Sequence, residues 1–383
     1  MSRFAPVRLV VALLIPAVFA AKAFAQPKPT ELKPLWSIRD DDEKMIVEKL
    51  GRMLATGSTT WIADPGKMQL THLDATGKPI GSIGRKGSGP GEFMQINWFD
   101  VGSNDSVYVW DEIQSRMSIF APNGMLARTE LLKEISQRTQ ILGRTSSGLW
   151  LVESIKSPNT MRGGVAQESV VVSVAASLHG PLKKILSLPG NSSFFVPGGR
   201  GTSIPFVAIT KLTGCEGGFV VSGGKSQNVR AYDANGRLLR DVLPKFANPA
   251  MSDAARSASL EGSAAYLDSG GGLGARKQLD RLAPNPASRP IDFQIGRDGR
   301  IWFQAIKQPF GWAILDIEGR SKMQVPIPSM FSTGFDEDSA VGQTFDADGT
   351  RTAARYALPF NARTPKKGPN LLHPALGRCS STV

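Results

Sequence analysis

Histidine and cysteine are scarce in this chain, since its 383 residues include three histidines and two cysteines. The histidines, His72, His179 and His373, lie far apart in the sequence, so no histidine-rich zinc site is predicted. The sequence also lacks a G-x-S-x-G motif and the Walker spacing of a phosphate loop. These absences favour a protein that is not an enzyme and that carries no cofactor.

Long apolar runs are equally scarce. The stretch Leu9 to Ala21 contains Pro16 and falls short of the roughly 20 residues that a membrane-spanning helix needs. Arg3 and Arg8 precede it, and an A-x-A motif ending at Ala25 follows it. This order predicts that residues 1–25 are a signal peptide cleaved after Ala25, so the mature protein is periplasmic or secreted and does not span the membrane.

Acidic residues are too few to balance the basic ones, because 45 lysines and arginines face 33 aspartates and glutamates, a net charge of +12. Three positive charges leave with the signal peptide, and four lie in residues 361–383 without an acidic residue, which leaves +5 for the rest. So small an excess gives no support to nucleic-acid binding. The basic tail, residues 361–383, is predicted to be disordered, with contact to an anionic surface as the alternative.

The two cysteines, Cys215 and Cys379, would meet an oxidising environment outside the cytoplasm. A disulfide that ties the tail to the body is chemically possible there. The sequence leaves the pairing open, because it does not show whether the two residues lie close together.

A hairpin unit recurs along residues 26–360. An aromatic residue in an apolar strand is followed, after 16 or 17 positions, by a turn glycine. The four pairs are Trp61 with Gly77, Tyr108 with Gly124, Phe219 with Gly236, and Trp302 with Gly319. The constant spacing predicts hairpins of one length whose tight turns use the positive φ that glycine adopts readily.

Two further copies are irregular. One carries a polar insertion at residues 157–167, and the other, around Gly349, lacks an outer strand. An inner strand is expected before each aromatic strand, in ranges 47–55, 96–101, 139–143, 206–212 and 290–295 and near Phe335. Four short strands per unit indicate a β-propeller blade, so residues 26–360 are predicted to form an all-β, six-bladed propeller with four-stranded blades.

Two segments stand outside this pattern. Leu35 to Ile38 has no partner of its own and is predicted to supply the missing strand of the sixth blade. Residues 253–282 are rich in alanine, follow a capping Ser252, and are interrupted by glycines at 270–272. They predict a small helical insertion between blades 4 and 5.

The segment from Gly84 to Phe93 resembles the inter-blade connector of bacterial exported six-bladed propellers related to NHL-repeat proteins. Asp64 and Asp111, each at the end of a second strand, and Arg116 match that family too. The resemblance implies the fold far more than a function. Four glycines in the connector also permit a phosphate-cradle interpretation, but no helix follows them, so a structural turn is favoured.

Asp64 and Asp111 occupy equivalent positions in two repeats. A repeated residue usually serves the blade itself, so we expect these carboxylates to accept hydrogen bonds from the backbone of the next hairpin rather than to act in catalysis. Asp111 and Arg116 are also candidates for a surface ion pair.

A ligand site is expected at the central channel, which the inner strands line. The candidate ligand-binding residues are Glu48, Arg52, Asn97, Gln140, Thr210, Lys211 and Gln294. The favoured function is a monomeric binding or scaffolding module for a protein, peptide or carbohydrate partner, with residues 157–167 and 190–205 shaping its surface.

The alternative is a metal-dependent hydrolase or lyase with a carboxylate-bound metal at the channel mouth. Asp346-x-Asp348-Gly349 is similar to the start of a calcium loop, but its remaining acidic ligands are missing. Calcium therefore stays a weaker expectation than a plain turn, and no metal ligands are assigned.

Overall fold

The structure is a computed structural model. It describes residues 32–39, 47–132, 139–158, 163–197, 200–207, 209–223, 227–246, 251–268, 274–284, 291–305, 311–327, 331–345, 349–359 and 372–380. The predicted signal peptide and the Asp346–Asp348 turn lie outside these ranges.

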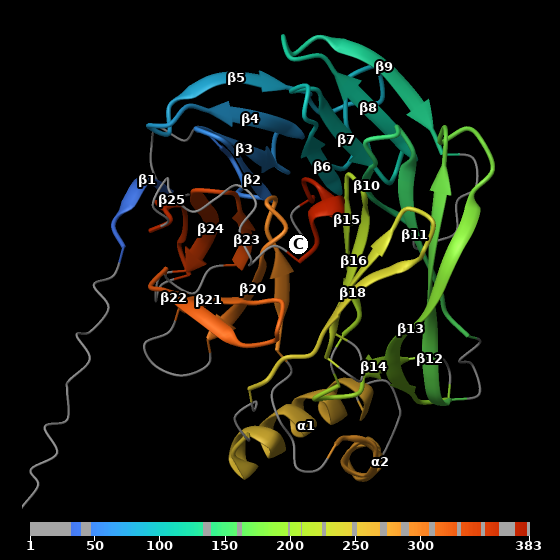
Figure 1. Cartoon of the computed structure of the whole chain (residues 1–383). Coiled ribbons are helices and arrows are strands. Elements are labelled where there is room, and N and C mark those ends of the chain that lie inside the picture. The colour runs from blue at the N-terminus through green and yellow to red at the C-terminus, as the bar shows by residue number, and fades with distance from the viewer. Residues whose placement is uncertain are drawn as a thin grey trace, which may run out of the picture.

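The described strands form six antiparallel sheets arranged around a centre, as the blades of a propeller (Figure 1). Blade 1 contains β2 (Met53–Thr56), β3 (Thr59–Asp64), β4 (Gln69–Leu73) and β5 (Pro79–Ile83), and blade 2 contains β6 (Trp98–Val101), β7 (Val107–Asp111), β8 (Arg116–Phe120) and β9 (Leu126–Leu131). Blade 4 contains β15 (Lys211–Cys215), β16 (Gly218–Ser222), β17 (Val229–Asp233) and β18 (Leu238–Val242), and blade 5 contains β19 (Phe293–Ile295), β20 (Ile301–Ala305), β21 (Gly311–Leu315) and β22 (Ser321–Val325). The predicted fold class is confirmed.

The outer hairpins form where the repeat places them. Gly77, Gly124, Gly236 and Gly319 all have φ between 80° and 82°. Apolar clusters fill the space between neighbouring blades, and Phe93, Phe99 and Val109 in one of them are fully buried. Burial of both faces of the middle strands therefore holds the blades together.

Blade 6 closes the ring with a strand from the other end of the chain. Its order is β1 (Pro34–Arg39), β25 (Arg351–Ala357), β24 (Ser339–Phe345) and β23 (Phe331–Phe335). Trp36 pairs with Arg355 and packs against Ile62 of blade 1. The prediction that the segment near Trp36 completes the last blade is confirmed.

Blade 3 departs from the predicted four strands. It has five: β10 (Thr139–Arg144), β11 (Trp150–Lys156), β12 (Gly164–Ala175), β13 (Lys183–Phe195) and β14 (Gly201–Ser203). The regions expected to be loops, 157–167 and 190–205, supply much of the extra length, because β12 and β13 pair from Val174 and Lys183 out to Gly164 and Phe195. Insertion has lengthened a hairpin rather than opened a loop.

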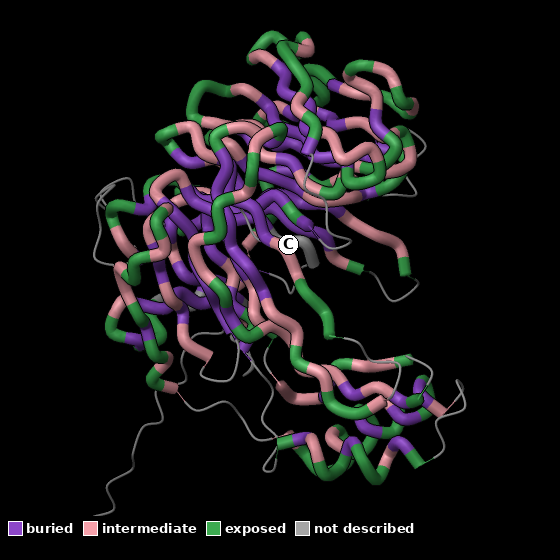
Figure 2. The backbone as a smooth tube through the Cα atoms, turned by 90° about the vertical axis from the view of Figure 1, so that its right-hand side faces the viewer, coloured by how far each residue is buried: buried purple, intermediate pink, exposed green. Residues whose placement is uncertain are grey.

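Two helices cover the far end of this extended hairpin. They are α1 (Asp253–Asp268) and α2 (Ala275–Leu282), and Leu260 and Leu279 pack against Phe194 and Ile204. The amide of Ala255 donates to the Ser252 hydroxyl at 3.2 Å, as expected for a helix cap. Figure 2 shows the helices as a lobe beside the propeller, which confirms the predicted helical insertion. No helix in the described ranges is long and apolar enough to span a membrane.

The repeated aspartates accept backbone amides of the hairpin turn that follows them, as predicted, at Gly66 and Gln114, and they also accept amides from before the inner strand, which was not predicted. Asp64 accepts the amides of Glu48 and Lys49 at 2.7 and 3.0 Å, and Asp111 accepts the amide of Met94 at 2.7 Å. Both carboxylates are fully buried and fix the segment that enters the inner strand of their own blade.

The expected pairing of Asp111 with Arg116 is wrong. Arg116 instead donates to the carbonyls of Ser88, Gly89 and Glu92 in the connector. Asp111 and Arg116 are cross-strand partners in β7 and β8, but each side chain bonds to the backbone before β6, Asp111 to amides and Arg116 to carbonyls.

Four inner strands start later than predicted, and among them β6 begins at Trp98 rather than Ile96 and β19 at Phe293 rather than Pro290. β2 begins at Met53, since the Asp64 carboxylate takes the amides of residues 48 and 49. β15 begins at Lys211, and Phe206, which was expected in that strand, has φ 66°, outside the strand region.

Candidate functional site

The end of the chain lies at the centre of the propeller (Figure 1). Residues 372–380, here called the C-terminal segment, include a 3₁₀ turn at Pro374–Leu376 and have Leu372, Leu376 and Cys379 buried. The prediction of a disordered tail is therefore wrong for these residues, while 361–371 and 381–383 lie outside the described ranges. Buried apolar side chains and a buried cysteine anchor this segment, although its basic composition predicted disorder.

Backbone hydrogen bonds fasten the segment to blades 4 and 5. The amide of Ser380 donates to Gly214 at 2.8 Å, and that of Cys379 donates to Arg297 at 2.9 Å. The amide of Glu216 in turn donates to Arg378 at 2.8 Å. A disulfide joins Cys215 to Cys379, which settles the pairing that the sequence left open.

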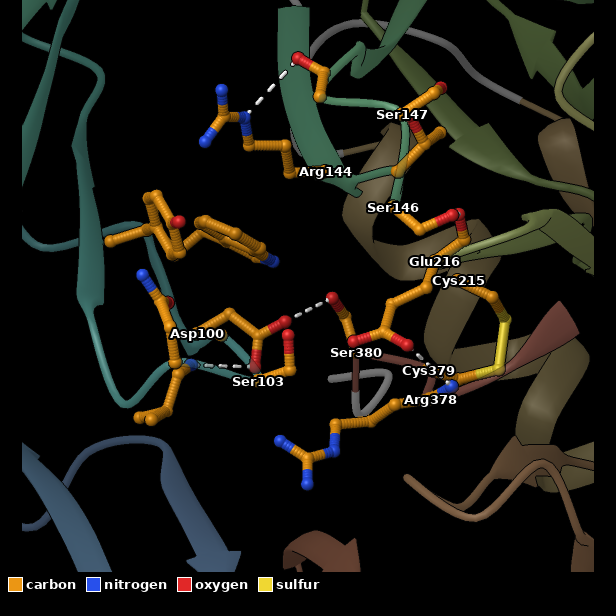
Figure 3. Close-up of a pocket in the computed structure, with 17 residues that line it drawn as sticks. Asp100, Ser103, Arg144, Ser146, Ser147, Cys215, Glu216, Arg378, Cys379 and Ser380 are labelled. Atoms are coloured by element: carbon orange, nitrogen blue, oxygen red, sulfur yellow. Dashed lines mark hydrogen bonds between the residues drawn. A yellow bond between two sulfur atoms is a disulfide. The ribbon is translucent and has the colours of Figure 1, made fainter.

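A cavity of about 370 Å³, the first cavity, opens between this segment and blades 2, 3 and 4 (Figure 3). The inner strands β6, β10 and β15 end beside it and contribute Asp100, Arg144 and Cys215. The turns that follow β6 and β10 add the polar residues Ser103, Asn104, Thr145, Ser146 and Ser147. Trp98 and Tyr108 supply aromatic surface.

Asp100 lies in a buried polar network at the wall of the first cavity. It pairs with Arg297, which is 2% exposed, and accepts the hydroxyl of Ser380. It also accepts the amide of Val101 at 2.8 Å. Blade 2, blade 5 and the C-terminal segment thus meet at one carboxylate, whose charge is already compensated by Arg297.

Two arginines face the first cavity from different elements. Arg144 stacks over Trp150 at 5.4 Å and donates to the carbonyl of Gly148 at 3.2 Å. Arg378 belongs to the C-terminal segment, and its side chain extends below Asp100 and Ser380 in Figure 3, whereas Arg144 lies above them. Across the described parts of the chain, the Arg378 guanidinium has no hydrogen-bond or ion-pair partner.

A second cavity, of about 280 Å³, lies where the inner strands begin. Arg52, Asn97 and Gln140 line it, together with Trp98 and Ser380, which also border the first cavity. The two cavities therefore adjoin along the channel.

Arg52 and Glu112 are the charged residues among those that line the second cavity. The Arg52 guanidinium stacks over Trp98 and Phe99 at 5.8 and 5.4 Å. Burial lowers the pKa of Arg52 to about 10, although Asp100 opposes the shift, so this arginine remains charged at neutral pH. Asn97 also exchanges hydrogen bonds with Glu112, at 2.9 and 3.0 Å.

The other predicted liners do not border either cavity. Glu48 is exposed beside Gly66, and Thr210 donates its hydroxyl to Pro189 at 3.1 Å. Lys211 pairs with Asp292 at 2.6 Å, and Gln294 is half-buried opposite Trp302 in the blade 5 sheet. Three of the seven candidates thus come together, and four do not.

The prediction placed the ligand site on the inner strands, whereas the first cavity is lined largely by the turns that follow them. Gly102-Ser-Asn and Thr145-Ser-Ser-Gly148 follow consecutive inner strands. Because inner strands run through the channel in one direction, equivalent turns gather at one mouth. The position of these two turns at one mouth of the channel could have been predicted from the repeat. The presence of Arg378 there could not, because it depends on the disulfide that the sequence left open.

The described ranges contain no group of three or more His, Cys, Asp or Glu side chains that could hold a metal ion. The carboxylates near the centre are instead engaged with arginines, hydroxyls and amides. The structure therefore assigns no ligands to the metal-dependent alternative.

Comparisons with known proteins agree with the fold. The DUF5128 family model, described as a 6-bladed beta-propeller, matches residues 41–126. No curated protein matches the chain. A DUF4221 family member from Bacteroides vulgatus is similar at a TM-score of 0.50 and 9% identity, covering 86% of this chain and 99% of that one.

Two further solved structures are less similar. A protein from Bacteroides fragilis described as exported has a TM-score of 0.46 at 10% identity, over 86% of this chain and 94% of that one. A streptogramin B lyase has a TM-score of 0.39 at 8% identity, over 84% and 97%. Likeness at these identities concerns the propeller fold alone, and the relation to NHL-repeat proteins stays a prediction.

Proposed function

We propose that this protein is an exported propeller that binds a small polar ligand in the first cavity. The observation that carries the proposal is the convergence of hydroxyl, amide and guanidinium groups from blades 2 and 3 and the C-terminal segment on one cavity of about 370 Å³. Concave sites with a few converging polar groups and some aromatic surface are the usual form of small-molecule sites.

The architecture supports binding more than scaffolding. The channel is occupied by the protein's own C-terminal segment, whose residues form part of the cavity wall. A segment that only filled the channel would need neither an exposed arginine nor a hydroxyl network at its edge. A cavity of about 370 Å³ suits a ligand of the size of a monosaccharide or disaccharide rather than a folded partner.

A screen of small molecules by thermal shift tests the proposal, with carbohydrates, organic acids and short peptides as separate sets. Ser103 is exposed in a turn at the cavity, so Ser103→Trp should block entry without disturbing the core. Ser103→Ala is the matched control. A compound that stabilises the native protein and Ser103→Ala, but not Ser103→Trp, supports the site. If no compound binds, or if binding survives Ser103→Trp, the proposal is wrong.

Export is the second part of the proposal and rests on the sequence of residues 1–25. Expression of the whole chain in a bacterium should yield a periplasmic or secreted product that begins at Gln26, which N-terminal sequencing would show. A product that keeps residues 1–25 would contradict it.

A further inference from the structure

We propose that the ligand of the first cavity is a small hydroxylated oxyanion, a sugar acid or its sulfate or phosphate counterpart, and that Arg378 binds its charged group. This inference rests on the proposed function, because it assigns a ligand class to the same site.

The charge around the first cavity is positive. Its wall contains Arg144, Arg378, Asp100 and Glu216. Asp100 is compensated from behind by Arg297. The remaining ionised groups are two guanidiniums and the single carboxylate of Glu216, so an anionic ligand is favoured over a neutral or cationic one.

Arg378 is the group best placed to receive an anion. The exposed side chain extends from the C-terminal segment at the edge of the cavity (Figure 3), with no partner for its guanidinium in the described part of the chain. Arg144, by contrast, is already engaged with Trp150 and Gly148. A guanidinium offers parallel N–H donors that match the two oxygens of a carboxylate and the oxygens of a sulfate or phosphate.

The backbone beside Arg378 is fixed on both sides. Its carbonyl accepts the Glu216 amide at 2.8 Å, and its amide approaches the Glu216 carboxylate at 3.3 Å. The next residue, Cys379, is bonded covalently to Cys215. The arginine is thus presented from an anchored backbone, which reduces the entropy lost when it binds a ligand.

The rest of the wall suits hydroxyl groups. Ser103, Asn104 and Ser147 are exposed at the two turns, and the Ser146 hydroxyl donates to the backbone carbonyl of Glu216 at 3.2 Å. Trp98 adds an aromatic surface. Many short donors and acceptors around one cationic group indicate a polyhydroxylated anion rather than a fatty acid or an aromatic acid.

The test compares four probes that share one sugar: D-galacturonate, D-galactose 6-sulfate, D-galactose 6-phosphate and neutral D-galactose. Isothermal titration should show binding of at least one charged probe, with little or no binding of galactose. Raising the NaCl concentration should weaken the binding of the charged probe, since solvent-accessible ion pairs are screened. The ranking of the three charged probes identifies the anion.

Variants locate the contact. Arg378→Ala should lower the affinity for the charged probe by about 10- to 100-fold, the loss expected for a hydrogen-bonded charge pair. Arg237→Ala is the matched control, because it removes an arginine with a 78% exposed side chain from the outer hairpin of blade 4. Circular dichroism and thermal midpoints of both variants should match the native protein.

The disulfide gives an independent readout. A dithiol reductant converts the Cys215–Cys379 bond to two thiols and itself becomes a disulfide. This treatment should weaken the binding of the charged probe. The Cys215→Ser/Cys379→Ser variant should bind as weakly and should not respond to the reductant.

The outcomes separate this inference from the proposed function. Suppose that a neutral compound binds the native protein but not Ser103→Trp, and that Arg378→Ala binds it normally. The cavity is then a ligand site, but the assigned ligand class is wrong. If none of the four probes binds, the oxyanion assignment is overturned. If no compound of any set binds, the proposed function fails as well.

Discussion

At the scale of single residues, buried carboxylates organise the blades. Asp111 is fully buried and accepts hydrogen bonds from the amides of Met94, Gln95 and Gln114 and from the Gln114 side chain. These contacts determine where the inner strand β6 begins. The same arrangement recurs at Asp64, so each carboxylate replaces strand pairing at the entry of its blade.

Asp111→Ala should therefore lower the free energy of unfolding by about 3 kcal/mol or more, because several buried amides lose their acceptor at once. Urea denaturation followed by tryptophan fluorescence measures the change. Asp253→Ala, at an exposed site in the first turn of α1, is the control and should change stability by no more than about 1 kcal/mol. Equal losses in both variants would contradict this role.

Asp298 should make stability depend on pH in the opposite sense to an ordinary salt-bridged aspartate. Burial raises the pKa of Asp298 to about 6, despite the opposing charge of Arg300. The native state thus holds a proton that the unfolded chain releases near pH 4. As the pH rises from 4 to 6, the free energy of unfolding should therefore fall, and this group should contribute up to about 3 kcal/mol of the decrease.

Asp298→Asn should remove that contribution. Thermal midpoints measured from pH 4 to 7 would show a shallower decline in the variant than in the native protein. Because other groups titrate as well, the informative quantity is the difference between the two curves. A difference that does not vary with pH would show that Asp298 has an ordinary pKa.

At the scale of elements, ring closure depends on β1. The strand pairs with β25, and Trp36 packs over the Gly77 turn of blade 1. The indole is 7% exposed, so β1 joins blade 6 to blade 1 as well as completing a sheet. Arg355 strengthens the same seam by donating to the carbonyl of Thr59 at 2.9 Å and to that of Gly57.

Deletion of residues 26–38 from the mature chain should lower the free energy of unfolding by about 3 kcal/mol or more, since burial of Trp36 alone is worth that much. Differential scanning calorimetry measures the effect. Deletion of residues 26–31 leaves β1 whole and should keep the native midpoint. An unchanged midpoint after the longer deletion would mean that the ring does not need this strand.

The sequence predicted regular elements better than their exceptions. Turn glycines and the helical insertion followed from short-range patterns, because each depends on local backbone chemistry, and the closing strand followed from the strand that the last repeat lacks. The extended hairpin of blade 3 was not predicted, since its polar residues pair along β12 and β13 without an apolar alternation. The order of the C-terminal segment depends on Cys215, which lies 164 residues earlier, and no local pattern reports such a contact.

The residues of the candidate site were likewise predicted only where a local pattern indicates them. Arg52, Asn97 and Gln140 were found because they sit near the starts of inner strands. The first cavity combines turns from two blades with a distant segment, so its residues share no sequence motif. Position within the repeat indicates which mouth of the channel a turn faces, but not what the end of the chain adds there.

At the scale of the whole molecule, the use of carboxylates bears on whether the propeller carries a metal. The carboxylates at the first cavity are engaged, Asp100 with Arg297 and Ser380, and Glu216 with the amide of Arg378. A divalent cation would have to compete with these partners and with the positive charge of nearby arginines. A divalent cation bound to both carboxylates would therefore have to displace contacts that they make in this structure.

Purified native protein should accordingly contain less than stoichiometric calcium and zinc by elemental analysis. Adding either ion should leave the thermal midpoint unchanged, because an ion that binds only the folded state would raise it. Magnesium at equal ionic strength controls for general salt effects. Stoichiometric calcium, or a rise in midpoint with calcium alone, would favour a metal-dependent hydrolase or lyase and would place its ligands outside the arrangement of Asp100 and Glu216.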